Sequence, residues 1–181
     1  MMRSSYKNND ITYSDLLSTI TQVVKPKRIL EIGILDGYSL ESFVKSSNNN
    51  TEIHAFDIFD DFNGNHSDIN TMISRFECFP NVKIAYGDFF NIHNNITKYD
   101  LIHIDIANTG GIFNYTMDHY FSKLTDDGVI IFEGGSITRD NVEWMIKYEK
   151  PQIYPVIQEY IKNGYNIKTY GDLPSITVIT K

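Results

Sequence analysis

One segment constrains the fold of this chain more than any other: an apolar run at residues 28–32 leads directly into a turn containing Gly33 and Gly37. Residues that favour a helix follow, so the pattern predicts a buried strand, a tight turn and a helix whose N-terminus faces a small ligand. An acid, Glu31, interrupts the apolar run just before the turn. A carboxylate at this position favours a partner with an amine or a positive charge and disfavours a pyrophosphate. The segment therefore predicts an amino-acid-like cationic ligand rather than a dinucleotide.

Length, charge and cysteine content set the outer bounds. The 181 residues are most simply one domain, 1–181, of which 1–10 are expected to form a disordered or loosely attached tail. A formal net charge of −7 disfavours nucleic acid as a partner, because phosphate binding relies on clustered Lys and Arg. There is no apolar run long enough to span a membrane, no signal-peptide pattern and only one cysteine, Cys78. We therefore expect a cytoplasmic globular protein with no membrane partner.

Strand and helix patterns alternate along the chain, which is typical of an α/β sheet. Apolar runs predict strands at residues 28–32, 52–57, 82–86, 101–105 and 129–133. Helical spacing predicts helices at residues 12–24, 39–45, 69–79 and 113–123, with one or two more between 140 and 164.

The C-terminal part distinguishes between two kinds of nucleotide-binding fold. Two further strands are predicted at 165–170 and 175–180, and only four residues separate them. Parallel neighbours need a crossover of a dozen or more residues, so these two strands must pair as an antiparallel hairpin. The predicted fold is therefore α/β, a doubly wound Rossmann-like sheet of seven strands with an antiparallel C-terminal strand and helices on both faces.

This order of elements resembles the class I S-adenosylmethionine-dependent methyltransferases, whose seventh strand is antiparallel to the rest. The turn after the first strand resembles the first motif of the small-molecule O-methyltransferases of the catechol and macrocin types. The resemblance implies that the methionine part of S-adenosylmethionine is held by Glu31, Gly33, Gly37 and Ser39. In the relatives, the acid faces the amino group and the serine binds the carboxylate. A structural alternative for Glu31 is a salt bridge with Arg28 or Lys27.

Later segments match the parts that hold the nucleoside. Asp57 follows Gly37 by twenty residues, the distance at which an acid reaches a ribose diol, and Ile58 would cover the adenine. The motif that contacts the adenine amino group in the relatives corresponds to Gly87, Asp88 and Phe89. Asp57 could instead cap the turn at residues 60–64, and Gly87-Asp88 is also a common turn pair.

The catalytic candidates follow the fourth and fifth strands. Asp105 resembles the site-facing acid of the family's fourth motif and also borders the cofactor, while Glu133 and Asn108 complete the set. In the divalent-metal-dependent relatives, acids at the places of Asp105 and Glu133 hold a magnesium ion, so Mg²⁺ is an implied cofactor. Two positions depart from that pattern: Gly134 replaces an Asp or Asn ligand, and Asn108 replaces a Lys or His base. Glu133 could instead bond only the backbone N–H groups of its turn.

The sequence therefore predicts methyl transfer from S-adenosylmethionine to a hydroxyl of a small-molecule acceptor, with a sugar or glycan unit as one candidate and S-adenosylhomocysteine as the product. One alternative is a module that binds the cofactor without catalysis. The other, an NAD-dependent oxidoreductase, is disfavoured by Glu31 and the terminal hairpin. Little sequence is left over for a substrate cap, so the pocket is either open or completed by a second subunit of a homo-oligomer.

Overall fold

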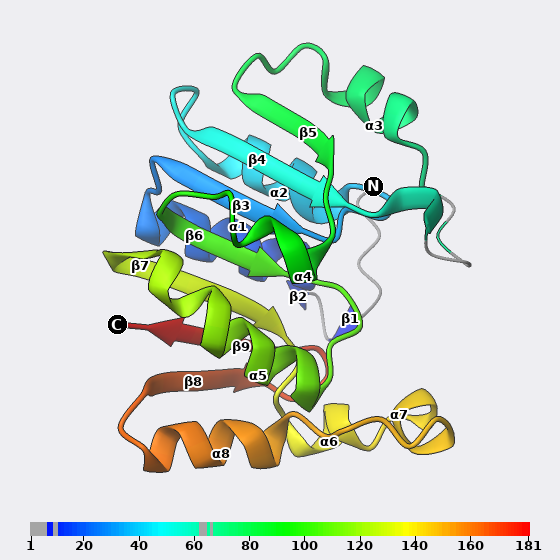
Figure 1. Ribbon diagram of the computed structural model, residues 1–181, viewed down its shortest axis with the longest axis vertical. Coiled ribbons are helices and arrows are strands. Elements are labelled where there is room, and N and C mark those ends of the chain that lie inside the picture. The colour runs from blue at the N-terminus through cyan, green and yellow to red at the C-terminus, as the bar shows by residue number, and fades with distance from the viewer. Residues whose placement is uncertain (1–6, 9–10, 62–64, 66) are drawn as a thin grey trace.

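The computed structural model describes residues 7–8, 11–61, 65 and 67–181 (Figure 1). Most of the predicted tail, residues 1–10, lies outside these ranges. Its two described residues form β1 (Lys7–Asn8), which pairs antiparallel with β2 (Ile11–Thr12). Within the described ranges, no helix has the length and apolar character needed to cross a membrane.

A seven-stranded sheet forms the centre of the molecule, in the order β5-β4-β3-β6-β7-β9-β8. Its strands are β3 (Arg28–Ile32), β4 (Glu52–Asp57), β5 (Val82–Tyr86), β6 (Tyr99–Ile104), β7 (Leu124–Glu133), β8 (Asn166–Gly171) and β9 (Ser175–Thr180). β3 to β7 pair in parallel, and β9 runs antiparallel to both of its neighbours. The predicted terminal hairpin and the predicted fold class are thereby confirmed.

Helices cover both faces of this sheet, with α1 and α2 behind it and α4 and α5 in front in Figure 1. The helices are α1 (Tyr13–Val24), α2 (Tyr38–Ser46), α3 (Ile69–Phe76), α4 (Phe89–Ile92), α5 (Gly110–His119), α6 (Ile137–Asp140), α7 (Glu143–Lys147) and α8 (Tyr154–Lys162), with short 3-10 turns η1 (Phe59–Asp61) and η2 (Phe121–Lys123).

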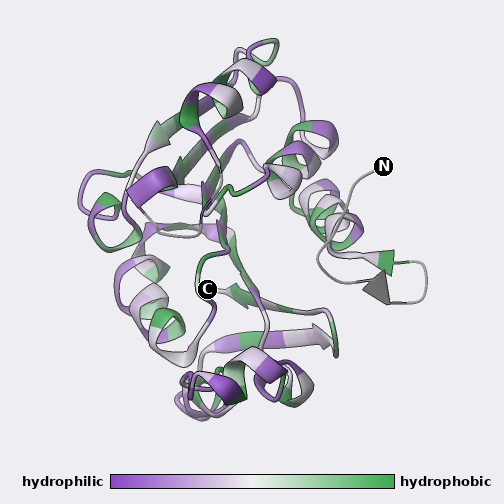
Figure 2. Cartoon of the chain, turned by 90° about the vertical axis from the view of Figure 1, so that its right-hand side faces the viewer, coloured by the Kyte–Doolittle hydropathy of each residue, from purple (hydrophilic) through white to green (hydrophobic). Residues whose placement is uncertain are grey.

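Each face of the sheet has its own apolar core, because successive residues of a buried strand point to opposite faces. Leu30 of β3 packs with Phe113 of α5, whereas Ile29 packs with Leu17 of α1 and Phe43 of α2. Figure 2 shows hydrophobic residues along the central strands and hydrophilic residues on the outer turns of the helices. Glu31 shares a face with Ile29, so its carboxylate points towards α1 and α2.

Helix ends differ most from the sequence expectation. α5 begins at Gly110 rather than near residue 113, because the Thr109 hydroxyl caps it and two glycines follow in helical geometry despite their low helix propensity. The segment expected to hold one or two helices holds three, α6 to α8. β7 begins at Leu124, five residues before the predicted start, and its pairing with β6 shifts register between Tyr99 and Leu101.

Candidate active site

The predicted site residues lie at the carboxyl ends of the parallel strands, where open α/β sheets bind ligands. Backbone hydrogen bonds join these strand ends directly. Gly33 N–H donates to the carbonyl of Phe56, and Gly87 N–H donates to the carbonyl of Asp57, both in bonds of 2.9–3.0 Å. The turns after β3, β4 and β5 therefore form one continuous edge, as the sequence predicted.

Glu31 lies in the middle of this edge and is completely buried. The hydroxyl of Ser39, in the first turn of α2, donates to its Oε1, and Nδ1 of His103 on the adjacent strand lies 3.7 Å from the same oxygen. Its other oxygen, Oε2, has no hydrogen-bond partner among the described residues. Arg28 pairs with Glu52 instead, so the alternative salt bridge to Glu31 does not form. A buried carboxylate oxygen without a donor is costly, and a ligand ammonium group would satisfy it.

Gly33 brings the backbone of this turn close to β6. Its φ is +93°, and a Cβ at this position would lie 2.0 Å from the carbonyl oxygen of Asp105. Only glycine accommodates both the conformation and the contact. Gly37 follows as the N-cap of α2, so the turn presents the N-terminus of that helix to the crevice.

Asp57 is buried at the end of β4, where the sequence places it, but its carboxylate is engaged by the protein. Oδ2 accepts from the backbone N–H groups of Ile34 and Leu35 at 2.7 and 3.1 Å. Oδ1 accepts from the N–H of Phe59 at 2.7 Å and from the side chain of Asn65 at 2.9 Å. Asp57 thus holds the backbone at Phe59 and also fixes the turn after β3, while most of the turn at 60–64 that the structural alternative named lies outside the described residues. Its contact with a ribose stays a prediction.

The remaining cofactor candidates are divided between the edge and the core. Ile58 is half-buried beside Asp57. Asp88 is the N-cap of α4, and its Oδ1 accepts from the N–H of Phe90 at 3.0 Å. The side chain of Phe89 is buried and stacks on Tyr120 with ring centroids 5.0 Å apart. Phe89 is therefore a core residue, and only its backbone lies along the edge.

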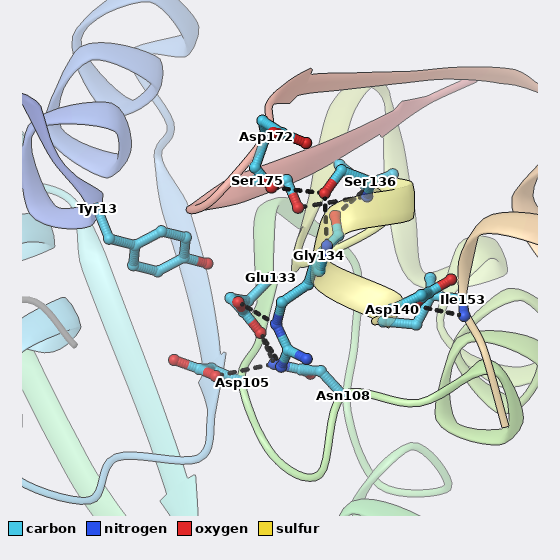
Figure 3. A network of polar contacts seen from close by, with 12 residues as sticks. Tyr13, Asp105, Asn108, Glu133, Gly134, Ser136, Asp140, Ile153, Asp172 and Ser175 are labelled. Carbon is cyan, nitrogen blue, oxygen red and sulfur yellow. Dashed lines mark hydrogen bonds and ion pairs between the residues drawn. The ribbon is translucent and has the colours of Figure 1, made fainter. Parts of the chain in front are cut away.

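Asp105 and Glu133 come together, as predicted, and Asn108 links them (Figure 3). The Asn108 amide donates to Oδ1 of Asp105 and to Oε2 of Glu133, each at 3.0 Å. The pKa of Asp105 is raised to about 6. Burial is the main cause, the charges of Glu133 and Glu31 act in the same direction, and His103 and the Asn108 hydrogen bond act against it. A carboxyl group with this pKa is ionised at neutral pH and still basic enough to take a proton.

Glu133 has a partner that the sequence analysis did not identify. Arg139 donates from Nε to Oε1 and from Nη2 to Oε2, both at 2.9 Å, and both side chains are buried. Two parallel N–H···O bonds make this a bidentate ion pair. The alternative that Glu133 bonds only the backbone N–H groups of its turn is therefore wrong.

The residues present do not fit a magnesium ion. Both oxygens of Glu133 are taken by Arg139, and Asp140 points to Ile153 and Tyr154, whose N–H groups donate to it at 3.0 and 2.7 Å. Across the described ranges, no three His, Cys, Asp or Glu side chains are arranged to hold a metal ion. Mg²⁺ prefers a nearly octahedral set of oxygen ligands with several waters, and a guanidinium at the same carboxylate repels a divalent cation.

Tyr13, the first residue of α1, is the second residue that sequence analysis missed. Its hydroxyl lies 3.0 Å from Nε2 of His103 and points towards Asp105 and Glu133 (Figure 3). Burial, followed by the charges of Asp105, Glu133 and Glu31, raises the pKa of Tyr13 well above its usual range, so the hydroxyl remains protonated. Tyr13 lies far from the motifs in sequence, and Arg139 follows Glu133 by six residues, but neither has a spacing that would identify it.

Six strands of the sheet run in one direction, and β9 runs antiparallel to them between β7 and β8. The acid–glycine turn lies at the carboxyl edge of this sheet. This fold and this site define a class I S-adenosylmethionine-dependent methyltransferase. The chain belongs to the methyltransferase-domain family, which matches residues 30–133. No curated protein matches it.

Several solved structures share this fold. A methyltransferase from Podospora anserina with bound S-adenosylhomocysteine is 16% identical, and the match covers 92% of this chain and 76% of that one with a TM-score of 0.72. An O-methyltransferase from Bacillus cereus, also with S-adenosylhomocysteine, is 16% identical over 97% of this chain and 84% of that one, with a TM-score of 0.68. The O-methyltransferase TomG from Streptomyces achromogenes, in complex with S-adenosylmethionine, is 14% identical over 93% and 79%, with a TM-score of 0.65.

Proposed function

We propose that this chain transfers a methyl group from S-adenosylmethionine to a hydroxyl group of a small molecule and releases S-adenosylhomocysteine. The observation that carries the proposal is the buried Oε2 of Glu31, which has no donor among the described residues at the point where the family's cofactor places its amino group. Similar folds crystallised with this cofactor or its product support the assignment.

The residues of the chain would then divide into a binding half and a reacting half. Glu31 would accept from the ammonium group, the glycine turn would approach the methionine part, and Asp57, Ile58, Gly87 and Asp88 would lie along the nucleoside. When bound, the cofactor supplies a methyl group on a positively charged sulfur. Methyl transfer is an in-line displacement, so the protein mainly aligns the acceptor and takes its proton.

Asp105 is the proposed general base. Its pKa of about 6 leaves it ionised at neutral pH, and its carboxylate is half-buried at the edge of the crevice. Asn108 holds Oδ1, which fixes the orientation of the carboxylate. As the acceptor oxygen attacks the methyl carbon, its proton would pass to Asp105. The negative charge of this group also compensates the positive charge of the sulfur.

Isothermal titration calorimetry tests the cofactor half of the proposal. The wild-type chain should bind S-adenosylmethionine, and Glu31→Gln should weaken binding by about tenfold or more, because it replaces a charge-assisted hydrogen bond by a neutral one. Glu52→Gln is the matched control, since Glu52 is exposed at the opposite edge of the sheet and should leave binding unchanged. No binding of S-adenosylmethionine or its product at millimolar ligand would refute the proposal.

Mass spectrometry of a panel of phenolic, sugar and other hydroxyl acceptors tests the reacting half. A methylated product that disappears in Asp105→Asn is expected. Binding of the cofactor without turnover on any acceptor would favour the alternative of a binding module.

A further inference from the structure

We infer that Arg139 is the resident cation at the acceptor end of this site, so that methyl transfer proceeds without a divalent metal and Arg139 positions Asp105 through Glu133 and Asn108. The inference deepens the proposed function and rests on it for the reaction, but its central claim concerns the charge balance of the chain alone.

Arg139 occupies the side of the Glu133 carboxylate at which a metal ion would bind. Its guanidinium meets both carboxylate oxygens at 2.9 Å, and the Asn108 amide adds a third donor to Oε2 at 3.0 Å. Arg139 is 3% exposed and Glu133 is 5% exposed, so water screens the pair only weakly. A metal ion would have to displace a bidentate, permanently charged partner from a buried carboxylate.

The backbone around Arg139 is shaped to hold its side chain in this position. The Ser136 hydroxyl caps the short helix α6 by accepting from the N–H of Arg139 at 3.0 Å. The aromatic ring of Trp144 lies 5.2 Å from the guanidinium carbon.

Gly134 links the missing metal ligand to the presence of Arg139. It stands where the metal-dependent relatives supply an Asp or Asn, and here its φ is +100°. A Cβ at Gly134 would lie 2.9 Å from Cδ1 of Ile153 and 3.4 Å from Cγ of Arg139. A side chain at residue 134 would therefore meet Ile153, contact the stem of Arg139 and require a backbone conformation that favours glycine, so this position is poorly suited to supply a metal ligand.

The charges support the same conclusion. Asp105 and Glu133 face each other on neighbouring strands, with Glu31 and the Tyr13 hydroxyl on the same face and His103 beside Glu31. Arg139 neutralises Glu133 directly, and the Asn108 amide transmits the fixed position of Glu133 to Asp105. Arg139 is thus a positioning residue that acts through two others on the proposed base.

The test measures metal binding and turnover on the full chain. Electron paramagnetic resonance should detect no bound Mn²⁺ in the wild type at millimolar Mn²⁺, and a chelator should leave methyl transfer unchanged. Arg139→Met removes the charged guanidinium and keeps an unbranched side chain that replaces the aliphatic stem of the arginine. This variant should have a kcat that is lower by roughly 10- to 100-fold, because Asp105 is no longer held in position. It should also bind Mn²⁺ through the carboxylates of Asp105 and Glu133. Arg139→Lys retains a cation and should bind no Mn²⁺.

Arg28→Met is the matched control, because Arg28 forms an ion pair with Glu52 at the amino edge of the sheet and should change neither readout. Wild-type chain that binds Mn²⁺ in a manner abolished by Glu133→Gln, or that loses activity with a chelator, would overturn the inference without need of any Arg139 variant. An Arg139→Met protein that folds, retains its kcat and binds no Mn²⁺ would overturn it as well. The Mn²⁺ measurements require no cofactor, so failure to bind S-adenosylmethionine would refute the proposed function separately.

Discussion

Three acids on one face of the sheet are each balanced in a different way. Glu31 accepts from Ser39 and lies near His103, Glu133 is paired with Arg139, and Asp105 accepts from the Asn108 amide. Burial is the main cause of the raised pKa of Asp105, which is about 6. Asp105 is therefore suited to accept a proton at neutral pH.

The raised pKa of Asp105 predicts that the same carboxyl group supports activity and lowers stability at neutral pH. Because the folded-state pKa of about 6 lies above the ordinary value of 3.8, the folded state binds more protons between these pH values than the unfolded state does. The free energy of unfolding should thus fall as pH rises from about 4 to about 6. Asp105→Asn should abolish methyl transfer and raise the free energy of unfolding at neutral pH by up to about 3 kcal/mol.

Urea titrations of the wild type and Asp105→Asn at acidic and neutral pH measure this effect. The two proteins should converge below about pH 3, where the wild-type carboxyl group is protonated in both states. Asp127→Asn, at an exposed position of β7, is the control and should change stability little at either pH. A stability difference that is the same at both pH values would contradict the assigned cause.

At the scale of elements, one acid, Asp140, connects the end of α6 to the start of α8. α8 has no side-chain cap of its own, and Asp140 at the end of α6 accepts from the N–H groups of Ile153 and Tyr154 just before and at its start. Asp140 therefore stabilises the N-terminus of a helix thirteen residues away in sequence. The same contact joins α6, which contains Arg139, to the start of α8.

Asp140→Ala should leave both N–H groups without an acceptor in a buried setting. We expect a loss of about 2–3 kcal/mol in the free energy of unfolding, measured by chemical denaturation. Glu143→Ala, at an exposed position in the first turn of α7, should cost less than about 0.5 kcal/mol. Equal losses in the two variants would show that Asp140 does not cap α8.

At the scale of the whole molecule, the predicted site residues lie at the strand ends of a single sheet or on the segments that follow them. Both cores pack against this sheet, so we propose that the chain unfolds as a single domain. The protein has a single tryptophan, Trp144, which lies in α7 at the edge of the sheet's helical cover. The homo-oligomer suggested by the short sequence available for a cap stays a prediction.

Two probes of urea denaturation test the proposed single domain. Trp144 fluorescence reports on the segment from α6 to α8, whereas far-ultraviolet circular dichroism reports on the whole chain. The two transitions should coincide in midpoint and slope. An earlier fluorescence transition would mean that this segment unfolds separately from the sheet.

Strands were predicted more accurately than helix ends. The strands at residues 28–32, 52–57, 82–86 and 175–180 have the predicted bounds, because runs rich in apolar and β-branched residues contrast with the polar turns that flank them. The starts of α5 and β7 were misplaced, since Thr109 overrides the low helix propensity of two glycines and a shift in register lengthens β7 at its polar end.

The sequence by itself determined the positions of the strands, the terminal hairpin and the acid–glycine turn, since all of these depend on local pattern and chain connectivity. Only the tertiary structure decided the partner of each acid: Asp57 is taken by the backbone of two turns, Glu133 pairs with Arg139, and Tyr13 faces the crevice from α1. The physical reason is that a buried charge is paired with whichever donor packing brings within 3 Å, and sequence spacing does not encode that contact. The turn at Gly33 could therefore be predicted from the sequence, whereas the pairing of Arg139 with Glu133 could not.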